Sequence, residues 1–241
     1  MMPESSSAPA SGPLTAETRA RLREMDPPFA PVIEALTENP WSRGVLPIQT
    51  VELVALAVNA ACTNLNAEGV RQHIRGALKA GVTRAEILMV LKMASLLSIH
   101  TCSLAAPILL EEAQAAGIAL GAATAGPTPV CDSMKAAGQW NAAWEPFFQL
   151  DPHWTESFIA AGAPVYLGRV FSPKVAELLS IAFDASITHM YAPGTRRHIR
   201  NALHAGASVE EIMEVLKICV AEGSQALNLG VSVLAEESPC S

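Results

Sequence analysis

The chain has 241 residues, half of them hydrophobic and few of them aromatic, which is typical of one large or two small domains of close-packed helices. A net charge of −7 without a Lys/Arg cluster argues against a nucleic-acid partner. No uninterrupted apolar run reaches the roughly 18 residues that span a bilayer, so we expect no membrane partner.

The first 20 residues are rich in Ser, Ala and Pro, and we expect them to be a disordered tail without a signal peptide. The stretch 47–63 is apolar on nearly every side and predicts a buried helix. In 69–81 the apolar residues follow the spacing i, i+4, i+7, i+8, which indicates an amphipathic helix that ends at Gly81. Thr83 and Glu86 form the capping-box pattern that begins the next helix. Because no alternating strand pattern occurs, the predicted fold class is all-α.

Residues 69–93 and 194–218 are two copies of one sequence at an offset of 125, with 14 of 25 positions identical and no gap. Their shared pattern is G-x-R-x-H-I-R-x-A-L-x-A-G-x-x-x-x-E-I-x-x-V-L-K. An internal duplication of this kind fixes the number of folding units. We therefore predict two tandem helical domains, 21–117 and 140–238, related by duplication. The segment 118–139, rich in Ala, Gly, Thr and Pro, is the expected linker.

Two pairs of polar residues interrupt the apolar pattern in both copies. His73 and His198 stand beside the apolar stripe of the amphipathic helix and face the interior. Glu52 and Glu177 stand near the start of the apolar helix. Each His has two interpretations, a core histidine satisfied by a neighbour or a catalytic group, and each Glu is either solvated or paired with the His. A carboxylate that holds an imidazole orients it for general acid–base catalysis, so these four are the candidate catalytic residues.

The residues around the two candidate pairs differ between the copies. Asp184 and Tyr191 belong to the second copy, and His100 to the first, so the two clefts are predicted to be chemically unequal. Arg43 and Arg169 precede the Glu helices and are candidates to clamp a substrate carboxylate, although either could be a plain surface residue. These five are the candidate substrate-binding residues.

Several common sites are missing from the sequence. No close His/Cys/Asp spacing of the kind that binds metals occurs on one element, so we expect no metal. There is no phosphate loop and no dinucleotide fingerprint, so we expect no cofactor. The five cysteines have no C-x-x-C spacing, which argues for a reducing cytoplasmic location and against a disulfide framework.

Each copy resembles the carboxymuconolactone decarboxylase family, whose domains share a fold with the alkylhydroperoxidase AhpD. The resemblance rests on WSRGVL, VELVALAV and HIRGALKAGVTRAEILMVL in the first copy, and on ELLSIAF and HIRNALHAGASVEEIMEVL in the second. It implies about six helices per copy and a homo-oligomer, a trimer for a duplicated chain. It also places the family's Glu at Glu52 and Glu177 and its His at His73 and His198.

The sequence departs from the peroxidases of this fold, which use a C-x-x-C between the Glu and the His. Cys62 stands there alone, and one thiol cannot complete a disulfide cycle within the site, so we expect no peroxidase activity.

We expect a cofactor-independent enzyme that uses His/Glu acid–base chemistry on a small carboxylated or lactone-type substrate. Decarboxylation through an enolate comes first, and isomerisation, lactone hydrolysis or carbon–carbon bond formation would use the same groups. Two alternatives remain. One is a non-catalytic oligomeric protein that binds a small molecule, and the other is a single-thiol redox protein that uses Cys62 or Cys102.

Overall fold

The computed structural model describes residues 12–119, 121 and 126–238, and every regular element in them is a helix. The first repeat contains α1 (Ala16–Met25), α2 (Ala30–Ser42), α3 (Ile48–Ala60), α4 (Ala67–Lys79), α5 (Arg84–Leu96), the 3₁₀ turn η1 (Leu97–Ile99) and α6 (His100–Ala115). Next come α7 (Pro129–Ala136) and η2 (Ala142–Trp144). The second repeat continues with α8 (Glu145–Leu150), α9 (Pro152–Leu167), α10 (Pro173–Ala185), α11 (Ala192–His204), α12 (Val209–Glu222) and α13 (Gln225–Glu237). The predicted all-α class is confirmed.

The duplication extends over six helices of each repeat. At the same offset of 125, α1 corresponds to η2 and α8, and α2 to α6 correspond to α9 to α13 in order. The helix boundaries form as the sequence predicts. Thr83 and Glu86 make a reciprocal capping box, repeated before α12, and Gly81 and Gly206 have φ of +88° and +85° after α4 and α11.

The central helices α3 and α10 pack against each other because both are apolar on nearly all sides. Just beyond their ends, the hydroxyls of Thr63 and Thr188 lie 3.2 Å apart. These two residues occupy equivalent positions of the two repeats, so a local two-fold axis passes between them.

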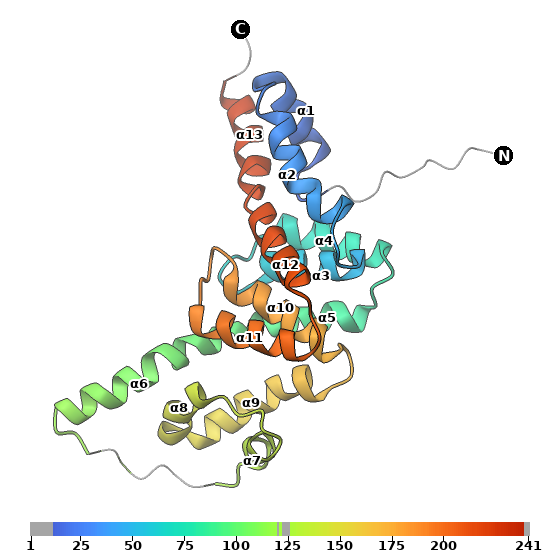
Figure 1. Cartoon of the computed structure of the whole chain (residues 1–241). Coiled ribbons are helices and arrows are strands. Elements are labelled where there is room, and N and C mark those ends of the chain that lie inside the picture. Colours follow the sequence, from blue (N-terminus) through green and yellow to red (C-terminus); the bar gives the residue numbers. More distant parts are fainter. Residues whose placement is uncertain (1–11, 120, 122–125, 239–241) are drawn as a thin grey trace.

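The repeats exchange helices across this axis (Figure 1). The last helix of each repeat packs against the first helix of the other, α6 on α8 and α13 on α1. Likewise α12 packs on α2 and α3, and α5 packs on α9. One hydrophobic core therefore contains residues of both repeats. The two tandem helical domains are therefore interlocked and share this core.

The expected boundaries shift at two places. The predicted tail of residues 1–20 ends earlier, since Leu14 is buried and α1 begins at Ala16, capped by Thr15. Residues 1–11 lie outside the described part of the chain. The predicted linker 118–139 contains α7, which packs on α9 because its Cys131 and Met134 are buried. Residues 120 and 122–125 of that linker also lie outside the described residues.

Two continuous helical stretches, Arg84–Ala115 and Val209–Glu237, are long and apolar enough to cross a bilayer by length and composition alone. Polar residues interrupt both stretches, so neither contains an unbroken apolar run of that length. In this structure a third of the most apolar 18-residue segment of each stretch is buried inside the protein.

Candidate active site

Each repeat contains a hydrogen-bonded Glu–His pair. In the first repeat His73 Nδ1 lies 2.8 Å from Glu52 Oε2, and in the second His198 Nδ1 lies 2.6 Å from Glu177 Oε2. A carboxylate can only accept, so Nδ1 carries the proton in both pairs. The structure thus joins the four candidate catalytic residues in two separate pairs, and Nε2 is the second ring nitrogen in each repeat.

In the first repeat that second nitrogen is occupied. His73 Nε2 makes an ion-pair contact of 3.1 Å with Glu222 Oε1, which α12 contributes from the other repeat. Asn59 donates to Glu222 Oε2 at 2.6 Å, and Trp41 donates to Glu52 at 3.0 Å. Burial by itself lowers the pKa of His73, but Glu222 and Glu52 outweigh it and raise that pKa to about 10. The imidazolium is therefore clamped between two carboxylates.

A hollow of about 880 Å³ lies over the first repeat. Arg71, Arg75 and Lys79 contribute to its lining, and His73 and Glu52 reach it with only 1% and 2% of their surface exposed. Although this hollow is large and basic, the imidazole beneath it has both nitrogens engaged. The arrangement resembles a structural ion cluster more than a proton donor.

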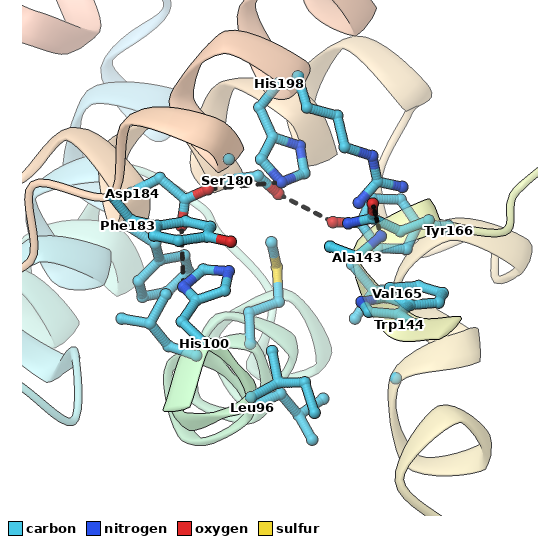
Figure 2. Close-up of a pocket in the computed structure, with 18 of the residues that line it drawn as sticks. Leu96, His100, Ala143, Trp144, Val165, Tyr166, Ser180, Phe183, Asp184 and His198 are labelled. Carbon is cyan, nitrogen blue, oxygen red and sulfur yellow. Dashed lines mark hydrogen bonds and ion pairs between the residues drawn. The ribbon is translucent and has the colours of Figure 1, made fainter. Parts of the chain in front are cut away.

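In the second repeat His198 faces a cavity of about 190 Å³ instead (Figure 2). Leu97, the counterpart of Glu222, lines this cavity, so a leucine replaces the clamping carboxylate. Leu96, Phe158 and other apolar side chains form much of the remaining wall. The ion-pair contact described for His198 Nε2 is a long one, 3.7 Å to Asp184 Oδ2.

Tyr166 and Ser180 lie beside this imidazole (Figure 2). The Tyr166 ring is parallel to that of His198 at 6.5 Å, and its hydroxyl lies 3.2 Å from Ser180 Oγ. Burial, with a contribution from the charge of Glu177, raises the pKa of Tyr166 to about 12. Its hydroxyl therefore stays protonated and is a hydrogen-bond donor at neutral pH.

Asp184 is a nearly buried carboxylate on the same cavity wall. Burial raises its pKa to about 6, against the opposing charges of His198 and Arg197. A Cβ on Gly194 would lie 1.9 Å from Asp184 Oδ2, and one on Gly69 would meet the equivalent Asn59 at 2.0 Å. The Gly of the repeated G-x-R motif is therefore required by the side chain packed against it.

Arg197 is the cationic residue of the cavity lining. Its guanidinium carbon lies 5.6 Å from the centre of the Trp144 ring, a cation–π contact that holds it at the edge of the cavity. Among the described residues no carboxylate forms an ion pair with it. Sequence reasoning missed Arg197 because basic residues of this helix fall mostly on its wet face. The signal available in the sequence was a difference between the repeats, because the first repeat has Gln72 at the position of Arg197.

The five candidate substrate-binding residues divide into two groups. Arg43 ends α2 and Arg169 lies in the turn before α10, and both are exposed. Neither is among the described residues that line the cavity. The structure does not bring these two arginines to either Glu–His pair, since each side chain is directed to solvent at a helix end.

The other three candidates, His100, Asp184 and Tyr191, meet in the second-repeat cavity. His100 comes from the first repeat, and its ring stacks on Tyr191 with centroids 3.9 Å apart. His100 Nδ1 lies 2.6 Å from Nε2 of His189, in the loop before α11. Burial, and then the neighbouring His189, lower the pKa of His100 to about 3. His100 is therefore neutral at physiological pH.

Two interlocked helical repeats, each with a buried Glu–His pair between its central and amphipathic helices, define a duplicated all-α scaffold. The model of the carboxymuconolactone decarboxylase family matches residues 27–98 and 152–236, and the chain belongs to this family. A crystal structure from Burkholderia xenovorans LB400, with a proposed identity of gamma-carboxymuconolactone decarboxylase subunit, is similar with a TM-score of 0.85. It shares 35% identity over 95% of this chain and 92% of that chain. No curated protein matches the chain.

Proposed function

We propose that this protein is a carboxy-lyase that acts in the second-repeat cavity on a small carboxylated or lactone-type molecule. One observation carries the proposal. The second-repeat His198 directs Nε2 at a mostly apolar cavity, whereas the equivalent nitrogen of His73 is held by Glu222. Membership of the carboxymuconolactone decarboxylase family supports the reaction class.

The reaction would need a β-keto or vinylogous acid, because such a substrate accepts electrons itself. The bond to the carboxylate breaks, CO₂ leaves, and the electron pair moves onto the carbonyl oxygen as an enolate. An apolar wall disfavours the charged carboxylate more than the spread-out charge of the transition state. Arg197, a cation, and the Tyr166 hydroxyl, a hydrogen-bond donor, both line the cavity and would stabilise the enolate oxygen.

His198 would then complete the reaction by protonating the enolate carbon from Nε2. Glu177 holds the opposite nitrogen at 2.6 Å and orients the ring for this proton transfer. The proton that is consumed returns to His198 from solvent, so the protein ends each cycle unchanged. Isomerisation, lactone hydrolysis or carbon–carbon bond formation would use the same enolate chemistry and are distinguished by product analysis.

The alternative function is a non-catalytic oligomeric protein that binds a small molecule. The first-repeat cluster favours this alternative, because there the same pair is fully buried and serves packing. In that case substitution of His198 would lower thermal stability, and no substrate of the stated class would be turned over.

The test compares His198→Gln with His204→Gln, an exposed histidine on the same helix, as the matched control. Release of CO₂ is followed over a panel of small β-keto and vinylogous acids, including carboxylated lactones. We expect His198→Gln to lower kcat by roughly 10²–10⁴-fold with a near-normal melting temperature, because general acid catalysis contributes about that factor. Turnover of His198→Gln within a few fold of the natural protein would show the assignment to be wrong.

A further inference from the structure

Three potential metal ligands lie close together beside the second-repeat cavity, and two of them, His100 and Asp184, line it. They are His100 at the start of α6, Asp184 near the end of α10 and His189 in the loop that follows, and their ligand atoms lie within 4.8 Å of one another. His100 Nδ1 is 2.6 Å from His189 Nε2 and 3.7 Å from Asp184 Oδ1. Two imidazoles and one carboxylate are a common ligand set for transition metals.

The carboxylate of this cluster lacks the partners that burial requires. Asp184 is only 2% exposed, and its Oδ2 has no hydrogen-bond partner among the described residues. A buried carboxylate is costly unless it is paired or binds a metal. Its described contacts with imidazole nitrogens, in His100 and His198, are both as long as 3.7 Å. A cation between Asp184 and the two histidines would compensate it.

The duplication supplies an internal comparison for this cluster. At the equivalent positions of the first repeat stand Gln225, Asn59 and Asn64, so all three ligand positions carry amides there. Asn59 donates to Glu222 and Asn64 donates to the carbonyl of Val58, and both are thus used in hydrogen bonds. Amides are poor ligands for transition metals. The same backbone positions therefore hold a hydrogen-bonded amide set in one half and a complete His₂Asp set in the other.

We propose that His100, Asp184 and His189 bind one divalent first-row transition ion per chain. Zinc–nitrogen bonds of about 2.0–2.1 Å at a tetrahedral angle place two nitrogens roughly 3.3 Å apart, so the two imidazole nitrogens, now 2.6 Å apart, need to separate by about 0.7 Å. Tyr191 stacks on His100 and fixes its ring plane. Three protein ligands leave open positions toward the cavity, where the ion would bind a substrate oxygen or water.

Metal binding does not rest on the proposed carboxy-lyase activity, because it is measured without substrate. The full chain is freed of metal with a chelator, dialysed, and titrated with Co²⁺ followed by visible absorption and with Zn²⁺ followed by calorimetry. We expect saturation at one ion per chain. Removing one ligand, in His100→Ala, His189→Gln or Asp184→Asn, should weaken binding at least about 100-fold, since even outer-shell changes cost 10–100-fold.

The matched control is the double variant His153→Ala/His204→Ala, which removes two exposed histidines outside the cluster and should bind as the natural protein does. Circular dichroism of the metal-free variants checks their fold, and His189→Gln, in a loop, serves if His100→Ala fails to fold. Failure of the natural protein to saturate by millimolar Co²⁺ would overturn the proposal. So would unchanged binding in His189→Gln, or an equal loss in the control.

Discussion

A single residue type has two different environments in this molecule. His73 and His198 occupy equivalent positions and hold equivalent glutamates, yet one faces Glu222 and the other faces Leu97 and a cavity. One difference is the side chain from the opposite repeat, and another is Asp184 in place of Asn59 on the central helix. In the first repeat the imidazole stabilises the fold, and in the second it is the proposed proton donor.

We predict that His73→Gln destabilises the protein by about 3–5 kcal/mol, because Glu52 and Glu222 would remain buried without their cation. Its pKa is raised in the folded state from 6.5 to about 10. This contribution is thus fully present below pH 6.5 and is lost as the pH rises through about 10. Urea unfolding between pH 6 and 10 measures it. The natural protein should lose stability over this range and His73→Gln should change less, whereas identical slopes would contradict the clamp.

Part of the site was readable at the level of residues. The inward positions of His73 and His198 follow from helical spacing, which is a local property. Their pairing with glutamates of another helix was one of two interpretations that the sequence left open, and packing decides between them. Glu222 as a partner of His73 was not readable, since it depends on how α12 crosses onto the other repeat. His100 and His189 are 89 residues apart, so their contact also depends on packing. That is why sequence spacing gave no sign of a metal ligand set.

At the scale of elements, the crossing of the amphipathic helix over the central helix depends on a glycine. In the second repeat Gly194 lies against Asp184, and in the first Gly69 lies against Asn59. The capping boxes and glycine stops were predictable because they are set within a few residues. The sequence shows only that both repeats have glycine at this position. It does not show the reason, because the side chain that needs the space comes from another helix.

We predict that Gly194→Ala destabilises the protein by about 1–3 kcal/mol, since the new Cβ would lie 1.9 Å from Asp184 Oδ2 and must displace it. Gly230→Ala is the matched control, because this helical glycine has nothing within 4 Å of its Cβ position. Alanine there should be neutral or stabilise by up to about 1 kcal/mol. Thermal unfolding of both variants measures the difference, and equal stability of the two would contradict this role of the glycine.

At the scale of the whole molecule, the sequence correctly predicts the family, the all-α class and the duplication, because repeated motifs survive without any tertiary information. It did not show that the halves interlock. The exchange of α1, α6, α8 and α13 depends on contacts between the repeats, and no local pattern encodes them. Within the predicted linker 118–139, α7 forms part of the packed structure, because Cys131 and Met134 are buried in a small cluster with Ile159.

We predict that neither repeat folds alone, because one hydrophobic core draws buried residues from both. The chain would be divided between Gly121 and Gly126, within the connection, and each fragment purified separately. Each should lack cooperative thermal unfolding, and mixing or co-expression should restore it along with the near-ultraviolet circular dichroism of the full chain. Cooperative unfolding of an isolated monomeric fragment would show that the repeats are independent domains.

The contact between Thr63 and Thr188 marks an axis about which the molecule is only approximately symmetric. Two identical chains joined about such an axis would have to carry every change in both of their sites at once. Within one polypeptide the two equivalent positions are encoded separately, so Glu222 and Leu97 can coexist. One half can therefore stabilise the fold through the buried His73 cluster, while the other half keeps an imidazole that faces a cavity.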